Sequence, residues 1–355
     1  MKRLVIDRQG VLNNLETVKA RVGQAKLYAV LTADAYGAGL LEMAELLHSR
    51  GITRFAVSEV AQAKALRKAG LTEEELLMLR STADRSELEE LLDLNVVFSI
   101  GSSEAGMALN ALAESRSTVA EAHVQVDSGM GYGGFVAGEP DKILSVFQNL
   151  QSVAISGVYT QLPSAGSGRK AAQEQLESFL ALVREIQAAG FETGVVHAAG
   201  SYAALHYDFA RLDAVRVGSA LLGRCRRKKE DGLQRVGFCE ASIEDVRWLP
   251  KGHVLGSEHP VRLKAPTRVA TLAVGYQNGL GVGPSRPEGF RALLRRWLGK
   301  DQPQIRVNGQ RARIIGQVGA METLIDVTEL KCGVGEPAQL ELDPLYAKGM
   351  AREYR

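Results

Sequence analysis

The sequence predicts an α/β protein, a TIM-like (β/α)8 barrel followed by a mostly β C-terminal domain. Short apolar runs alternate with segments of helical periodicity over the first two thirds of the chain. After about Gly232 the alternation stops, and short β-type stretches such as 268–275 and 312–316 follow, separated by Pro and Gly. The length of 355 residues exceeds the usual size of one core, which favours two domains.

Eight apolar runs have the length and composition of strands buried on both faces. They lie at 27–31, 54–58, 76–80, 95–99, 122–127, 153–159, 193–197 and 212–217. Helical periodicity separates them, for example at 59–69, 104–115 and 170–189. A doubly wound open sheet shows the same alternation, so periodicity alone does not separate the two folds.

Composition indicates an ordinary globular protein, with 45% apolar and 24% charged residues. Lys+Arg 43 against Asp+Glu 41 gives no basis for nucleic acid or anionic lipid as a partner. The basic run 224–229 could bind a polyanion, although a solvated interdomain loop is the favoured interpretation. Three widely spaced cysteines without CxxC pairing argue against a zinc site and fit a reducing cytoplasm. We expect no bound metal, and no signal peptide or membrane span is evident.

The first apolar run ends in a polar, glycine-rich segment, so the side chains at 32–36 should lie at a strand's carboxyl end, with Gly37 and Gly39 turning into the next helix. The stretch 27–40 resembles the cofactor segment of the alanine racemase family of pyridoxal-phosphate enzymes. In that family the position of Thr32 is the lysine that forms the Schiff base with the cofactor. A threonine hydroxyl cannot form an imine, so the resemblance implies a racemase-like pocket without its covalent anchor.

The resemblance covers nearly the whole chain and implies a domain division. Residues 8–232 would form the barrel that holds the pyridoxal-phosphate pocket, with its first helix starting at 11–18. Residues 233–355 would form the C-terminal domain, on which the N-terminal strand 1–7 packs.

Several motifs resemble the cofactor-binding side of the family's pocket. The segment 197–205 begins a helix with small residues that present backbone N–H groups to an anion. The resemblance assigns phosphate binding to Tyr36, Ser201, Gly218 and Ser219, and contact with the pyridine nitrogen to Arg216, while Gly200 replaces an asparagine. An arginine in an apolar strand needs an acceptor, and a structural salt bridge is the alternative for Arg216.

The catalytic and substrate side differs from the family pattern. In the glycine-rich turn 127–134, which could also be a plain strand-to-helix connection, Tyr132 stands where the family has a substrate-binding arginine. Upstream, Gln125 stands where many members have the lysine that orients this arginine. Ser257 occupies the position of the catalytic tyrosine, and Gln161 that of a histidine on the cofactor ring. The substrate-contacting methionine corresponds to Ala320, with Met321 displaced by one. Near the terminus, Tyr346 and Tyr354 are candidates for a missing phosphate-binding tyrosine.

These replacements predict a protein that binds pyridoxal phosphate, or another small amino-acid or phosphate-bearing ligand, non-covalently and does not racemise. The alternatives are a functioning racemase of the alanine or serine type, or another pyridoxal-phosphate enzyme, and a dimer-forming regulatory pseudoenzyme. The resemblance also implies a homodimer, with an active racemase paralogue as a further candidate partner.

Overall fold

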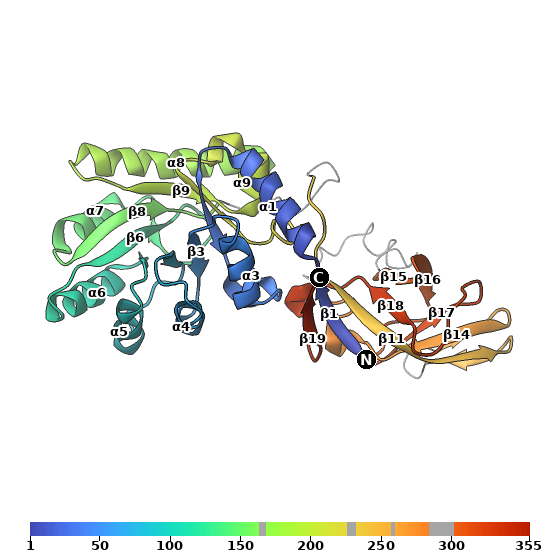
Figure 1. Cartoon of the computed structure of the whole chain (residues 1–355). Helices are drawn as coiled ribbons and strands as arrows, with labels where there is room; N and C mark the ends of the chain where they lie inside the picture. The colour runs from blue at the N-terminus through green and yellow to red at the C-terminus, as the bar shows by residue number, and fades with distance from the viewer. Residues whose placement is uncertain (163–167, 226–231, 257–259, 284–301) are drawn as a thin grey trace. The chain divides into compact units, whose positions relative to one another are not determined.

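The computed structural model describes residues 1–162, 168–225, 232–256, 260–283 and 302–355. It divides into two compact units, one of Gly10–Arg235 and the other of Met1–Gln9 with Val236–Arg355 (Figure 1). Among the described residues, no helix is long and apolar enough to cross a membrane. Within the same residues, no group of three or more His, Cys, Asp or Glu side chains could hold a metal ion.

The larger unit is a closed barrel of parallel strands. The strands lie in the order β4-β3-β2-β10-β9-β8-β6-β5, and the short β7 (Phe135–Val136) pairs with β6. A parallel bridge between Leu77 and Val97 joins β4 to the segment before β5 and closes the ring. The eight barrel strands are β2 (Lys26–Val30), β3 (Arg54–Val57), β4 (Glu75–Met78), β5 (Phe98–Ile100), β6 (Ala120–Asp127), β8 (Val153–Tyr159), β9 (Val195–Ala199) and β10 (Ala214–Val217).

This closure confirms the predicted barrel and excludes the doubly wound sheet, because neighbouring strands follow one another in the sequence and no edge remains. Seven observed strands overlap the predicted runs closely. The run 95–99 is displaced, since β5 begins only at Phe98 and Val97 instead makes the closing bridge.

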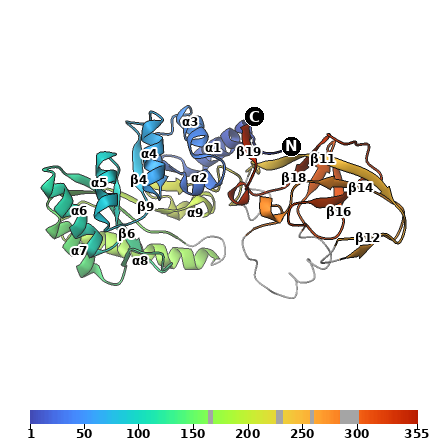
Figure 2. The same ribbon diagram turned by 90° about the horizontal axis from the view of Figure 1, so that it is seen from below.

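Helices surround the outside of this barrel and follow one another around it (Figure 2). They are α1 (Arg8–Val22), α2 (Thr32–Tyr36), α3 (Leu40–His48), α4 (Val60–Lys68), α5 (Arg85–Asp93), α6 (Ser103–Ser115), α7 (Pro140–Asn149), α8 (Gly168–Ala188), α9 (Ser201–His206) and the 3₁₀ turn η1 (Asp208–Ala210). The local sequence explains where several helices begin. The side chains of Asp84 and Ser102 cap the N-termini of α5 and α6, and Pro140 is the first residue of α7.

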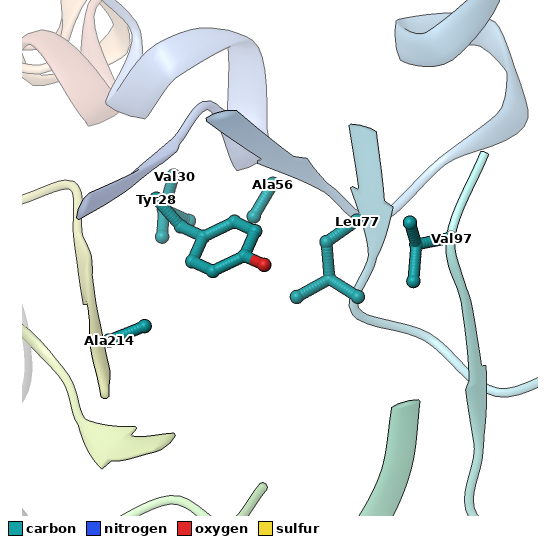
Figure 3. Packing of buried hydrophobic residues seen from close by; sticks show 6 residues of the cluster. All are labelled: Tyr28, Val30, Ala56, Leu77, Val97 and Ala214. Atoms are coloured by element: carbon teal, nitrogen blue, oxygen red, sulfur yellow. The ribbon is translucent and has the colours of Figure 1, made fainter. Parts of the chain in front are cut away.

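The barrel interior is apolar in one layer and polar in another. Figure 3 shows the apolar layer, in which six side chains from neighbouring strands and from the segment before β5 gather inside the barrel. They are Tyr28, Val30, Ala56, Leu77, Val97 and Ala214, all buried. The polar layer contains two buried histidines, His123 and His197.

Gly157 on β8 makes room for one of these histidines. A Cβ added there would lie 2.6 Å from the His123 ring, closer than real side chains approach. We therefore expect Gly157→Ala to lower the free energy of unfolding by roughly 1–3 kcal/mol, because an added methyl overpacks the barrel interior. Urea unfolding, followed through the circular dichroism signal of the helices, measures this free energy.

Gly138→Ala is the matched control, since a Cβ at Gly138 meets nothing within 4 Å. Equal midpoints for the two variants would contradict the steric argument.

The smaller unit is built on antiparallel strands. Six of them, β11, β14, β17, β16, β15 and β18, pair in a closed ring, because the long β11 pairs with β18 through its first half and with β14 through its second. On the outside of the ring, β1 pairs with β11, and β19 pairs in parallel with β1. A mostly β C-terminal domain is thereby confirmed.

The elements of this unit are β1 (Lys2–Ile6), β11 (Phe238–Leu249), β12 (Val254–Leu255), β13 (Val261–Arg262), β14 (Thr267–Leu272), η3 (Tyr276–Asn278), β15 (Ile305–Val307), β16 (Gln310–Ile314), β17 (Thr323–Asp326), β18 (Pro337–Leu340), η4 (Pro344–Tyr346) and β19 (Ala351–Tyr354).

Candidate functional site

The carboxyl ends of the barrel strands carry most of the predicted cofactor-binding residues. Because the strands are parallel, these ends meet at one end of the barrel, where barrel enzymes build their sites. Tyr36 lies just beyond β2, Gln161 beyond β8, Ser201 beyond β9 and Gly218 beyond β10. Arg216 lies within β10 itself. Contacts among these residues give the site its geometry.

Two backbone N–H groups and a hydroxyl converge beyond β10. The amides of Gly218 and Ala220 donate to Ser201 Oγ at 3.1 and 3.3 Å. The Tyr36 ring lies against Gly218, and a Cβ on that glycine would overlap the ring. Amide donors beside hydroxyls are the groups that bind phosphate oxygens in proteins. We call Tyr36, Ser201, Gly218 and Ala220 the anion cradle.

Tyr36 reaches the cradle through a backbone turn that the sequence did not predict. Ala33, Asp34, Ala35 and Tyr36 all have left-handed torsions, with φ between 51° and 56°. Such torsions cost roughly 1–2 kcal/mol per residue for L-amino acids, so four in succession mark a segment held by its surroundings. Hydrogen bonds from the Ala35 amide to the Leu31 carbonyl and from the Gly37 amide to the Ala33 carbonyl, both 2.9 Å, span the turn.

Thr32 begins this turn, and its hydroxyl hydrogen-bonds to Tyr36. Burial raises the pKa of the Tyr36 phenol, and the hydrogen bond from Thr32 offsets part of that rise. The phenol is therefore neutral at physiological pH and can donate a hydrogen bond to an anion.

Arg216 is a buried cation, 4% exposed, whose partners are neutral. Its Nη1 donates to His197 Nδ1 at 2.6 Å, and its Nη2 donates to the Thr160 carbonyl at 2.6 Å and to Gln161 Oε1 at 2.7 Å. The guanidinium also lies over the Tyr159 ring, 4.9 Å from its centroid. Among the ion pairs of the described residues none involves Arg216, so the alternative of a structural salt bridge finds no support there.

Burial lowers the pKa of Arg216 to about 10, and the phenols of Tyr159 and Tyr28 work against that decrease. The guanidinium therefore stays charged near neutral pH. A charge held in the barrel by neutral groups alone is stabilised by a ligand that offers it an acceptor.

A pair of histidines, not assigned a role from the sequence, continues this hydrogen-bond chain. His197 Nε2 lies 3.0 Å from His123 Nδ1. Since Arg216 can only donate, His197 Nδ1 accepts, and the proton of His197 must sit on Nε2 and point to His123. The only signal in the sequence was a histidine inside each of two apolar strand runs.

Both imidazoles are held neutral. Burial lowers the pKa of His123 to about 3, with further contributions from the charges of Arg216 and Lys26. Burial, Arg216 and His123 hold the pKa of His197 well below its ordinary value. The rings of Tyr28 and Tyr159 both stack on the His197 ring, at centroid distances of 5.5 and 5.0 Å.

Two residues predicted on the substrate side belong to β6 and the turn that follows it. Tyr132, in the turn after β6, is 83% exposed. The turn itself is ordered by Asp127, whose carboxylate accepts from the amides of Gly129, Met130 and Gly131 at 2.8 to 2.9 Å. Gln125 packs instead against Gly101, where a Cβ would lie 3.1 Å from its Oε1.

In the smaller unit, Ala320 and Met321 lie in a loop hydrogen-bonded to η3. The Tyr276 amide donates to the Gly319 carbonyl at 2.9 Å, and the Gln277 amide donates to the Ala320 carbonyl at 3.1 Å. Met321 and Tyr276 are each 50% exposed. The exposed phenol of Tyr276 therefore belongs to the same loop pair, although the sequence had given it no role.

The remaining predicted residues are distributed as follows. Ser219 lies between the two cradle amides, but no contact assigns it a role. Tyr346 lies in η4 and Tyr354 in β19, where Arg8 stacks on its ring. Ser257 and most of the basic run, residues 226–229, lie outside the described residues.

Comparison with known proteins identifies relatives over nearly the whole chain. The family model described as alanine racemase, N-terminal domain, matches residues 6–225, and that of the C-terminal domain matches residues 237–344. A broad specificity amino-acid racemase of Vibrio vulnificus is 30% identical over 327 residues, covering 90% of this chain and 75% of the relative. An alanine racemase of Desulforamulus reducens is 26% identical over 329 residues, covering 91% and 84%.

Solved structures show the same fold. An alanine racemase of Clostridium difficile superposes with a TM-score of 0.84 at 20% identity, covering 100% of this chain and 95% of that one. The alanine racemase of Bartonella henselae with covalently bound pyridoxal phosphate has a TM-score of 0.82 at 21% identity, covering 100% and 99%.

Proposed function

Because the chain belongs to the alanine racemase family, we propose that it binds pyridoxal phosphate, or an adduct of it with an amino acid, non-covalently and does not racemise amino acids. One observation carries the proposal. The chain keeps an anion cradle beyond β10 but has a hydroxyl, Thr32, beyond β2 in place of an amine. When bound, pyridoxal phosphate supplies an aldehyde that condenses with amines and a ring that withdraws electrons from a substrate.

The cradle fits the phosphate of this cofactor. The amides of Gly218 and Ala220 and the Ser201 hydroxyl lie together, and the absence of a Cβ on Gly218 lets the Tyr36 ring pack beside them. Arg216 is charged and finds only neutral partners, which suits a ring nitrogen as acceptor. The Thr32 hydroxyl cannot bond covalently to the aldehyde, so the attachment made by the family's lysine does not fit.

The proposed site has no acid–base groups that could carry out the proton transfers of racemisation. Racemisation removes a proton from one face of Cα and returns one to the other, and each positioned acid or base contributes roughly 10²- to 10⁴-fold. By resemblance, the lysine and the tyrosine that serve as the two bases are Thr32 and Ser257 here. Neither hydroxyl is acidic enough for this role near neutral pH.

Titration with pyridoxal phosphate, followed by its absorbance spectrum, tests the binding. We expect saturable binding that is lost on gel filtration, and a roughly tenfold weaker affinity for Ser201→Ala, because one charge-assisted hydrogen bond to the phosphate is removed.

Ser145→Ala is the matched control, since the Ser145 hydroxyl only donates to the Lys142 carbonyl on the exposed side of α7. Borohydride reduces an imine between a lysine and the cofactor to a stable bond. If the cofactor stayed on the protein through gel filtration after this treatment, it would be covalently attached to a lysine, and the proposal would be wrong.

We further propose that the protein forms a homodimer, as the family resemblance implies, and that an active relative could replace one subunit. Sedimentation at micromolar concentration should give the mass of two chains. A monomer throughout that range would remove both suggestions while leaving ligand binding untouched.

A further inference from the structure

Resting on the proposed function, we infer that Gln161 is the positioning residue of Arg216 and that it restricts this arginine to single hydrogen bonds with a ligand. The Gln161 amide lies on the exposed rim beyond β8, and its Oε1 accepts from Arg216 Nη2 at 2.7 Å. The Thr160 carbonyl accepts from the same nitrogen at 2.6 Å. Both N–H groups of Nη2 are therefore used by the protein.

This use of Nη2 has a consequence for recognition. A guanidinium binds a carboxylate or phosphate at two points either end-on, through Nη1 and Nη2, or side-on, through Nε and Nη2. Each arrangement needs a free N–H on Nη2. With Gln161 in place, Arg216 can offer only Nε or the second N–H of Nη1, each of which makes one bond. A ligand with a single acceptor, such as a neutral heteroaromatic nitrogen, fits this donor set, and an end-on or side-on carboxylate does not.

Gly200 holds the space that Gln161 needs. A Cβ on Gly200 would lie 2.8 Å from Gln161 Nε2. The torsions of Gly200, φ −82° and ψ −179°, are open to any residue, so the backbone does not require glycine there. We therefore attribute the glycine at position 200 to the space that the Gln161 side chain needs. Thr160 and Gln161 directly follow β8, Gly200 directly follows β9, and Arg216 lies in β10. These three strands are neighbours, so the barrel holds the contact in place.

The test compares pyridoxal phosphate with its analogue in which C–H replaces the ring nitrogen. The wild-type protein should bind the first roughly 10- to 100-fold more tightly, which is the effect of one hydrogen bond from a charged donor. In Gln161→Met, which keeps the volume but loses the oxygen, and in Gly200→Ala, that ratio should fall to about threefold or less, because the freed guanidinium is no longer aimed at the nitrogen.

Additivity separates this role from general damage to the site. Gln161→Met and Gly200→Ala act on one contact, so the double variant should be no worse than either single one. Gly138→Ala, where a Cβ meets nothing, should keep the wild-type ratio. An unchanged ratio in either single variant, or additive losses in the double variant, would overturn the inference.

A second readout needs no ligand. The hydrogen bond from Arg216 to His197 Nδ1 fixes the tautomer of that ring, so the ¹⁵N resonance of His197 Nδ1 reports where the guanidinium lies. It should shift in Gln161→Met and Gly200→Ala and stay in Gly138→Ala. If the wild type binds neither compound, the proposed function fails, and this resonance alone decides whether Gln161 positions Arg216: no shift in the two variants refutes it.

Discussion

Replacing Thr32 by lysine is expected to attach pyridoxal phosphate covalently without restoring racemase turnover. The amine gives the barrel the covalent anchor and one base, but the opposite face of Cα still lacks its base if, as the resemblance implies, Ser257 stands at the tyrosine position. One missing base leaves the rate roughly 10²- to 10⁴-fold below that of an active relative. The resemblance also implies that the exposed Tyr132 replaces the substrate-binding arginine, and this loss would lower the rate further.

Racemisation of L-alanine, followed as loss of optical rotation, measures this effect. The wild type should show no turnover, Thr32→Lys a stable covalent absorbance band with a trace of turnover, and Thr32→Lys with Ser257→Tyr a clear gain over the single variant. Thr32→Met is the matched control, because it has a similar length without an amine. Near-normal rates from Thr32→Lys alone would show that the second base is not needed.

The barrel is expected to lose stability as the pH falls from about 6.5 to 5, before most carboxylates titrate. His123 and His197 are neutral in the folded barrel because burial and Arg216 lower the pKa of each, in His123 to about 3. In the unfolded chain they titrate near pH 6.5. Below that pH the unfolded state binds more protons than the folded state, so the free energy of unfolding falls as pH falls.

The size of the effect can be worked out for His123. Each unit of pH between its unfolded and folded pKa costs about 1.4 kcal/mol, so at pH 5 His123 alone costs roughly 2 kcal/mol, and His197 acts in the same direction. That is a sizeable part of the 5–15 kcal/mol, roughly, by which domains are stable. Above pH 6.5 both rings are neutral in both states, and the stability should not depend on them.

Urea unfolding at pH 7, 6, 5 and 4, followed by helical circular dichroism, checks this prediction, since the described helices of eight or more residues belong to the barrel unit. His123→Gln, which keeps an acceptor for His197, should remove roughly 2 kcal/mol of the stability lost between pH 6.5 and 5. His253→Gln, at an exposed position of the other unit, should leave it unchanged. A wild-type midpoint that is constant down to pH 5 would mean that the histidines are not held neutral.

Much of the fold could be predicted because buried strands leave a direct signal in the sequence. Runs such as 27–31 and 153–159 are apolar on both faces, and their length and spacing reflect the barrel. Closure could not be predicted in this way. It depends on the Leu77–Val97 bridge, and the apolar pattern of each run does not indicate which other run it pairs with.

For the candidate site, too, the residues could be predicted but their contacts could not. Motif resemblance brought Tyr36, Ser201, Gly218 and Arg216 to attention, and the structure places them at one end of the barrel. The same comparison with the family identified Gln161 and Gly200 as separate replacements. It did not indicate that they touch, or that both serve the orientation of Arg216.

By itself, then, the sequence determined the alternation of strands and helices, the family, and the absence of an amine at position 32. These features depend only on the types of residues and on their order along the chain, and both can be read directly from the sequence. The left-handed turn at Ala33–Tyr36, the neutral histidine pair and the neutral surroundings of Arg216 were decided by tertiary structure. A strained torsion, a shifted pKa or a shared donor arises only when strands distant in sequence bring side chains together and exclude water from them.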